Sequence, residues 1–403
     1  MQSVTHRQLF FQHVAQTSEF PLALEIDRAE GVYLYSTTGQ QYMDLISGIG
    51  VSNVGHRHPA VVKAIQDQLD KYLHLMVYGE YVQTSQTSLA YALADTLAPY
   101  QSPHGPLSNV YFTNSGTEAI EGAMKLAKRF TGRTEIISCF NAYHGATQGA
   151  LSLSGDENFK RNYRPLLPGI RHMEFGNLDH VERISCRTAA VVIEVISAES
   201  GIRVPNPAYL QAVRQRCTEV GALLIFDEIQ TGFGRTGTFW AFEDFGPVVP
   251  DVLVCAKGMG GGMPIGAFIS SPDVMSVFKN NPILGHITTF GGHPVSCAAS
   301  LATLNVIRDE QLYAQAETKG QLFRALLSGC SAIRQIRGKG LMLAAEFDSF
   351  EVLKPVIDRA ILSGVITDWF LFCNNSMRIA PPLIISEEQI REACAVILGA
   401  IDA

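Results

Sequence analysis

Short apolar runs alternate with helical stretches between Ser108 and Ser270. The runs are SNVYFT, EIISCF, AAVVIEVI, ALLIFDE, DVLVCAK and GAFIS, and most of them are apolar throughout. Strands that are covered on both faces have this composition, and strands separated by helices form parallel sheets with crossover connections. The pattern therefore predicts an α/β fold with a mainly parallel sheet.

One helical stretch in this region is GTEAIEGAMKLAKRF. Its small and apolar residues recur at helical spacing and share one face, with polar residues opposite: Ala119, Ile120, Ala123, Met124 and Ala127. A helix that packs on a sheet has this arrangement. We therefore expect this stretch to cover one face of the predicted sheet.

After His293 the pattern changes to helical runs, then to short strands near Leu341–Phe347 and Ser376–Ile379, and ends in an amphipathic helix. This change predicts a second, smaller α+β domain. We expect residues 1–48 to be an N-terminal segment of the small domain, residues 49–294 the large domain, and residues 295–403 the rest of the small domain.

Composition narrows the class of protein. The chain has 403 residues, of which 47% are hydrophobic and 17% charged, so it can bury a large core and is not disordered. Its net charge of −7 comes with dispersed Lys and Arg, which argues against nucleic acid as a partner. The sequence shows no signal peptide and no span for a membrane, and its 8 cysteines, none in a CxxC pair, indicate buried thiols in a reducing cytoplasm.

The segment from Gly232 to Gly237 matches the dinucleotide-binding pattern G-x-G-x-x-G and follows an apolar run. The residues after it, TFWAFEDFGPVVPD, are aromatic and contain prolines. They do not form the long small-residue helix that such a motif must open. We therefore interpret these glycines as a loop near the site.

Ser115, Gly116 and Thr117 lie where an apolar strand gives way to a helix. The free N–H groups of a first helical turn and two hydroxyls are suited to bind a phosphate. An ordinary capped helix, with Ser115 or Thr117 as the cap, explains the same residues. Taken alone, the capping interpretation is the stronger one.

Two charged positions follow other strands. Asp227 closes the run ALLIF, at the sheet edge where α/β proteins bind ligands. A carboxylate there is suited to cap a helix or to pair with a cationic ligand. Metal binding is disfavoured, because the sequence offers no further ligands at suitable spacing. Lys257 ends the run VLVCA and precedes a glycine-rich segment. Burial there favours a neutral amine that attacks an aldehyde, although a strand-end lysine can also extend to solvent.

Histidines suggest further possibilities. His56 and His58 in GHRHP lack a third ligand at suitable spacing, so we assign them a structural role and expect no metal. Tyr143 and His144 follow the strand IISCF and can present an aromatic face to a planar ring. Core packing of Tyr143 is the alternative.

Several segments together resemble the class III aminotransferases, which belong to fold type I of the pyridoxal-phosphate enzymes. The matching segments run from about Gly31 to Pro382: MDLISGIGVSNVGHRHP, TNSGTEAIEGAMKLAKRFTGR, NAYHGAT, FDEIQTGFGRTG, PDVLVCAKGMGGGMPIGA, HITTFGGHPVSCAA and RIAPPL. The resemblance implies pyridoxal 5′-phosphate as the cofactor. It also implies the large α/β domain and smaller domain of that fold.

The resemblance assigns roles to individual residues. Lys257 resembles the family's Schiff-base lysine, and Asp227 resembles the carboxylate that pairs with the ring nitrogen, so the ring can act as an electron sink. Gln230 resembles the residue that hydrogen-bonds the ring's hydroxyl side, and Tyr143 resembles the stacking aromatic. The phosphate site corresponds to Ser115, Gly116 and Thr117. Thr289 resembles a threonine that reaches the phosphate of the neighbouring subunit, which implies a homodimer with shared sites.

Substrate contacts are implied by the same resemblance. Glu194 and Glu199 correspond to two family glutamates, although this chain has EVISAESG where relatives often have proline and glutamine. Arg378 resembles an arginine that pairs with Glu199 or binds a substrate carboxylate. Relatives acting on acylornithine, ornithine or 4-aminobutyrate commonly have an arginine where this chain has Ala146.

The resemblance and these residues predict a ping-pong aminotransferase that moves an amino group to a 2-oxo acid. The expected donor is an ω-amine or an ω-amino acid, such as a donor of the acetylornithine, ornithine or 4-aminobutyrate type. The lack of an arginine at Ala146 tilts the expected acceptor towards pyruvate. An arginine from elsewhere in the pocket is an almost equally good expectation. The alternatives are an aminomutase or a dialkylglycine decarboxylase of the same fold, a dinucleotide-dependent dehydrogenase, and a catalytically silent binding protein.

Overall fold

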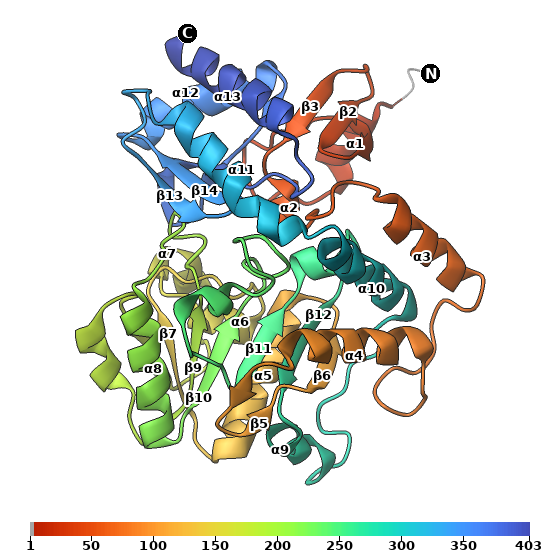
Figure 1. Cartoon of the computed structure of the whole chain (residues 1–403), viewed down its shortest axis with the longest axis vertical. Helices are drawn as coiled ribbons and strands as arrows, with labels where there is room; N and C mark the ends of the chain where they lie inside the picture. The colour runs from red at the N-terminus through yellow and green to blue at the C-terminus, as the bar shows by residue number, and fades with distance from the viewer. Residues whose placement is uncertain (1–3) are drawn as a thin grey trace.

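The computed structural model describes residues 4–403. The largest sheet in this range has seven strands in the order β6-β12-β11-β10-β9-β7-β8 (Figure 1). Their bounds are β6 Asn109–Thr113, β7 Glu135–Cys139, β8 Ile170–Met173, β9 Thr188–Glu194, β10 Leu223–Asp227, β11 Val252–Cys255 and β12 Gly266–Ser270. The strands from β8 to β11 are parallel to one another, which confirms the predicted α/β class.

Two strands of this sheet differ from the expectation. β12 is antiparallel to both of its neighbours, because the short segment between β11 and β12 has no helix long enough to make a crossover. β8 was not predicted from the sequence. Its residues, IRHM, lie at the edge of the sheet and are half polar, so they lack the apolar run that marks the inner strands.

Helices cover both faces of the sheet. The predicted helical face is confirmed in α5 (Gly116–Thr131), which packs on β9, β11 and β12 with Ala119, Ile120, Ala123, Met124 and Ala127 buried. The other helices of this part are α3 Pro59–Leu69, α4 Thr84–Leu97, α6 Gln148–Leu153, α7 Glu157–Lys160, α8 Pro207–Val220, α9 Pro272–Met275 and α10 Pro294–Asp309. Short 3-10 turns and a small hairpin complete it: η1 Arg161–Tyr163, η2 Leu178–Arg183, η3 Ala241–Phe245, η4 Lys257–Gly260, η5 Ser276–Lys279, β4 Gln101–Ser102 and β5 Gly105–Pro106.

Segments from the two ends of the chain share one sheet. β15 (Val365–Ile366) pairs in parallel with β3 (Gln41–Asp44), so that Val365 lies opposite Met43. The Ser47 hydroxyl donates to the Ala380 carbonyl, 333 residues later. Figure 1 shows these segments together at one end of the molecule, away from the large sheet. This arrangement supports the expectation that the N-terminal segment is part of the small domain, and the exact boundaries stay a prediction.

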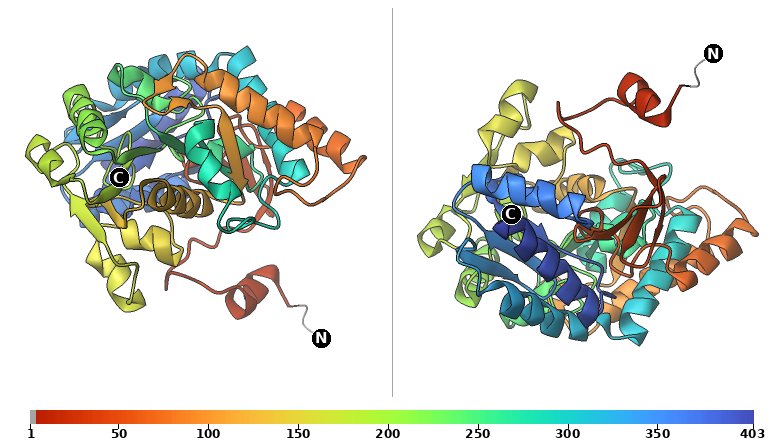
Figure 2. Two further views of the ribbon diagram at one scale, coloured as in Figure 1. Left: turned by 90° about the horizontal axis from the view of Figure 1, so that it is seen from below. Right: turned by 90° about the horizontal axis from the view of Figure 1, so that it is seen from above.

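The remaining elements belong to the same end of the molecule. They are β1 Ile26–Glu30, β2 Tyr33–Ser36, α2 Ser47–Gly50, α11 Leu312–Leu327, β13 Gln335–Lys339, β14 Met342–Glu346, α12 Phe350–Leu362, β16 Trp369–Phe370, β17 Cys373–Ile379 and α13 Glu387–Asp402. The strands β13, β14, β17 and β16 form an antiparallel sheet in that order. Helix α1 (His6–His13) projects from the rest of the chain in both views of Figure 2, and none of its residues is buried.

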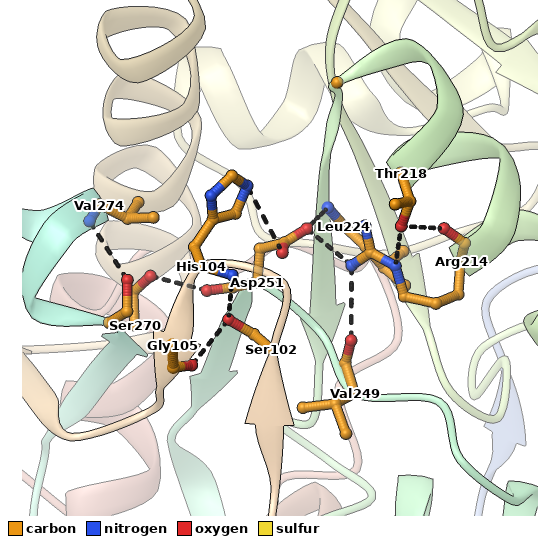
Figure 3. Close-up of polar contacts among 12 residues, drawn as sticks. Ser102, His104, Gly105, Arg214, Thr218, Leu224, Val249, Asp251, Ser270 and Val274 are labelled. Atoms are coloured by element: carbon orange, nitrogen blue, oxygen red, sulfur yellow. Dashed lines mark hydrogen bonds and ion pairs between the residues drawn. The ribbon is translucent and has the colours of Figure 1, made fainter.

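A buried carboxylate ties the amino ends of the central strands together. Asp251, just before β11, accepts hydrogen bonds from the Leu224 N–H and the Arg214 guanidinium, each at 2.7 Å (Figure 3). The His104 ring of the β4–β5 hairpin lies 3.9 Å from its other oxygen. A buried charge needs such partners. The amino ends of these strands are therefore occupied by structural contacts, and the carboxyl ends are the place to look for a binding site.

The prediction that the cysteines are buried is right for five of them: Cys139, Cys217, Cys255, Cys297 and Cys394. It is wrong for Cys186, which is exposed, and for Cys330 and Cys373, which are half-buried, because these three lie in turns or at an element's end. Within residues 4–403, no helix is long and apolar enough to cross a bilayer.

Candidate active site

A cavity of about 500 Å³ opens at the carboxyl ends of the parallel strands. It is where an α/β sheet is expected to bind a ligand. Apart from Val51, its lining comes from the carboxyl ends of β6, β7, β9, β10 and β11 and the segments that follow them: Asn114, Ser115, Gly116, Thr117, Tyr143, His144, Gly145, Ala146, Glu194, Asp227, Ile229, Gln230, Thr231, Ala256, Lys257, Gly262, Met263, Pro264 and Ile265.

One wall of the cavity is the amino end of α5. Ser115 is the N-cap, and its hydroxyl accepts the Glu118 N–H at 3.4 Å, so the capping interpretation is correct. Gly145 packs against this turn with a φ of +131°, and a Cβ there would lie 2.2 Å from the Thr117 hydroxyl oxygen. Because the first N–H groups of a helix have no partners within it, this close-packed turn is suited to hold an anionic group such as a phosphate.

Lys257 lies at another wall, directly after β11. Its backbone has a φ of +46°, in the left-handed region that residues with a side chain rarely adopt. Its amine donates to the Gln230 side-chain oxygen at 3.2 Å. Burial lowers the pKa of the amine, which increases the fraction of the neutral nucleophile. The alternative of a lysine extending to solvent is wrong for this side chain.

Asp227 is buried at the end of β10, where two hydrogen bonds fix its carboxylate. One oxygen accepts the Ile229 N–H at 2.9 Å, and the other lies 2.7 Å from Nδ1 of His144. Burial of His144 opposes its protonation, but Asp227 outweighs this effect and raises the pKa of His144. Because an ionised carboxylate can only accept, Nδ1 of His144 is the donor in this pair. The sequence placed both residues near the site, but gave no signal for this pair.

Two further cavity residues were expected from the resemblance. Burial raises the pKa of Glu194 to about 7, although its carboxylate accepts the Ala198 N–H at 3.1 Å. Tyr143 lines the cavity with 37% of its surface exposed, which excludes the alternative that it packs in the core. An accessible aromatic face at the mouth of the cavity is suited to cover a planar ligand.

Glu199 and Arg378 form a bidentate ion pair, with N–O distances of 3.0 and 3.1 Å. Both are buried, and neither is among the residues that line the cavity. Burial opposes ionisation of Glu199, but Arg378 outweighs this effect and lowers the pKa of that carboxyl. Asp368 contacts the same guanidinium at 2.7 Å. Sequence reasoning missed Asp368, because only the hairpin of β16 and β17 brings it to Arg378.

Thr289 is exposed and does not contact this chain's cavity. Its neighbour Thr288 accepts a hydrogen bond from the side-chain amide of Asn114, a cavity residue, at 3.2 Å. The sequence analysis also missed Val51, Met263 and Ile265, which lie in loops with no chemical signature. Among residues 4–403, no cluster of three His, Cys, Asp or Glu side chains is arranged to hold a metal ion.

The segment from Gly232 to Gly237, which matched the dinucleotide-binding pattern, has a structural role. Arg235, between its second and third glycines, is buried and donates to the carbonyls of Leu341 and Pro381 and to the side chain of Asn53. Residues after Gly232 form turns, and no long helix follows them. The segment therefore fastens the C-terminal part of the chain to the large sheet, and the dinucleotide interpretation is wrong.

These residues fit one kind of ligand. A helix amino end for a phosphate, a buried amine for an aldehyde, a fixed carboxylate for a ring cation and an exposed aromatic face suit pyridoxal 5′-phosphate. Fold and site together are those of a pyridoxal-phosphate enzyme of fold type I.

Comparison with known proteins identifies the family. The model of the class III aminotransferases matches residues 14–401, so the chain belongs to this family of pyridoxal-phosphate-dependent aminotransferases. It is 38% identical to the acetylornithine aminotransferase of Methanopyrus kandleri over 97% of both chains. Two solved structures are also similar. The ornithine aminotransferase of Toxoplasma gondii has a TM-score of 0.88 at 30% identity and covers 97% of this chain and 93% of that one. A pyridoxal-phosphate-bound amine transaminase from an uncultivated Pseudomonas species has a TM-score of 0.88 at 25% identity and covers 97% of both chains.

Proposed function

We propose that the site transfers an amino group in two half-reactions, in ping-pong order, with Lys257 as the central catalytic residue. The supporting observation is the position of its buried amine in the same cavity as the Asp227–His144 pair. The bound cofactor supplies a ring that accepts the electron pair left when a substrate carbon loses its proton. Lys257 holds the cofactor between turnovers and moves that proton.

The other residues bind and orient. Asp227, fixed by His144, carries the negative charge that keeps the ring nitrogen protonated. Tyr143 would cover the ring face, and Gln230, which accepts a hydrogen bond from Lys257, would bind the ring's hydroxyl side. Ser115, Gly116 and Thr117 bind the phosphate. Glu194, close to the Asp227–His144 pair, adjusts the charge of this group through its raised pKa.

The donor that we propose is an ω-amine or an ω-amino acid, and the acceptor is preferably pyruvate. The cavity lining among the described residues contains Ala146 and no arginine, so it offers no guanidinium to a distal carboxylate. Arg378 is the substitute, but Glu199 occupies it. Within this class of donors, acetylornithine is a specific candidate, because the similar enzyme of Methanopyrus kandleri is an acetylornithine aminotransferase.

Specificity constants test this proposal. A donor panel of simple ω-amines, 4-aminobutyrate, ornithine and acetylornithine is assayed with pyruvate and with 2-oxoglutarate. We expect higher kcat/KM with pyruvate, and Arg378→Ala should lower kcat/KM for 2-oxoglutarate by about tenfold or more, because it removes a bidentate partner. A strong 2-oxoglutarate preference that survives in Arg378→Ala contradicts the proposal. Release of an oxo product without carbon dioxide separates transfer from the mutase and decarboxylase alternatives.

We further propose a homodimer in which Thr289 reaches the partner's phosphate. The exposure of Thr289, beside a residue held by Asn114, supports this placement. A cytoplasmic location stays a prediction from the sequence.

Mixing two impaired variants tests the shared site. Lys257→Ala and Thr289→Ala chains are unfolded together and refolded as a mixture, so that a hybrid dimer has one complete site. Random pairing should restore roughly one quarter of the parent activity, since half of the dimers are hybrids with one of two sites intact. If verified hybrids recover no activity, each site is built from a single chain.

A further inference from the structure

The guanidinium of Arg378 is shared by two carboxylates. Its Nη1 and Nη2 donate to Glu199 at 3.0 and 3.1 Å, and its Nε donates to Asp368 at 2.7 Å. Nη2 also lies 3.4 Å from the Trp369 carbonyl, and the ring of Phe370 is 4.4 Å from the guanidinium carbon. Each of the three guanidinium nitrogens is thus already engaged.

The charges of Arg378, Glu199 and Asp368 do not balance. One positive charge faces two carboxylates, and the Arg378 side chain is only 3% exposed, so solvent screens the group weakly. Burial raises the pKa of Asp368 and Arg378 opposes this rise, as expected for a carboxylate that competes with a second one. An incoming substrate carboxylate would add a third negative charge beside one guanidinium.

The two carboxylates are attached differently. Asp368 and Arg378 lie opposite each other in the hairpin of β16 and β17, where the Arg378 N–H donates to the Asp368 carbonyl at 2.9 Å. The Thr367 hydroxyl also donates to the Arg378 carbonyl at 2.6 Å. Glu199 comes from the separate loop after β9. Asp368 therefore stays beside Arg378 whichever position the Glu199 side chain takes.

We propose that Asp368 is a specificity-determining residue: its fixed negative charge weakens the binding of substrate carboxylates at Arg378 and favours substrates without a carboxylate at that end. Glu199 can be displaced by a carboxylate, but Asp368 remains and neutralises the guanidinium. The inference rests on the proposed function in that it takes Arg378 as the carboxylate contact. It adds that the strength of this contact is set by a residue outside the cavity lining.

Binding of glutarate to the holoenzyme tests the charge effect without turnover. Glutarate is a dicarboxylate without the reactive carbonyl, and its dissociation constant is measured by calorimetry. Asp368→Asn keeps the side-chain shape and removes the charge, and it should tighten glutarate binding by about tenfold, with no gain in the Asp368→Asn/Arg378→Ala double variant. KM for 2-oxoglutarate should fall similarly, while KM for pyruvate, which has no distal carboxylate, and KM for an amine without a carboxylate change less than about twofold. Asp358→Asn, which removes an exposed carboxylate of a helical ion pair, is the matched control.

The conservative variant separates charge from structure. Asp368→Glu retains the negative charge and should keep glutarate binding near that of the parent. Equal tightening in Asp368→Asn and Asp368→Glu, or unchanged glutarate binding in a folded Asp368→Asn, overturns the inference. A donor screen that shows a different amino donor changes the proposed function and leaves the glutarate result standing, so the two failures are distinguishable.

Discussion

Lys257→Ala is expected to leave a folded protein with turnover reduced by on the order of 10⁴-fold or more. General acid–base catalysis alone contributes roughly 10²–10⁴-fold, and this variant also loses the covalent attachment of the cofactor. Alanine retains a Cβ and therefore the left-handed backbone strain at this position, but the substitution also removes an amine whose charged form is disfavoured by burial, so stability should change little. Steady-state assays and thermal unfolding of the same preparation measure both effects.

The residue assignment is checked chemically. Borohydride reduction of the holoenzyme, followed by peptide mapping, should place the cofactor label on Lys257. Lys160, a second buried lysine that pairs with Glu157 outside the cavity lining, provides the control, and Lys160→Ala should retain the label and most of the activity. A label on any other lysine refutes the central role of Lys257.

Asp227→Ala should lower kcat on the order of a hundredfold or more while the cofactor stays bound. A preorganised charge that stabilises the transition state contributes this much, whereas cofactor retention depends mainly on the phosphate contacts and Lys257. The absorbance of the retained cofactor after gel filtration measures binding, and single-turnover rates measure the chemical step. Turnover within a fewfold of the parent would show that the carboxylate does not support the ring.

The positions of Asp227 and Lys257 in the cavity could be predicted from the sequence, because both residues end a recognisable strand. Apolar runs mark parallel strands, and parallel strands bring the residues that follow them to one edge of the sheet. Asp227, Lys257 and the turn at Ser115 all satisfy this rule and line one cavity. The buried face of α5 could also be predicted from the sequence, because the helical repeat of its apolar residues is a local pattern.

Other features of the fold and site could not be predicted, because they depend on pairing between distant segments that leaves no pattern in the local sequence. The antiparallel direction of β12 follows from a connection too short for a crossover, and the contact of Asp368 with Arg378 follows from hairpin register. The hydrogen bond between His144 and Asp227 joins two separate strand ends. The residues that follow the glycine pattern at 232–237 argue against a dinucleotide site, but no local pattern shows the buried contacts that Arg235 makes.

The sheet shared by β3 and β15 has a consequence for biosynthesis. Met43 is synthesised well before its partner Val365, because about 320 residues of the sequence lie between them. At roughly 5–20 residues per second, the wait between them is on the order of tens of seconds. During that interval the large sheet can form while the first strands remain without their partner. The nascent chain therefore exposes an unfinished sheet edge, of the kind that chaperones shield, until Val365 has been made.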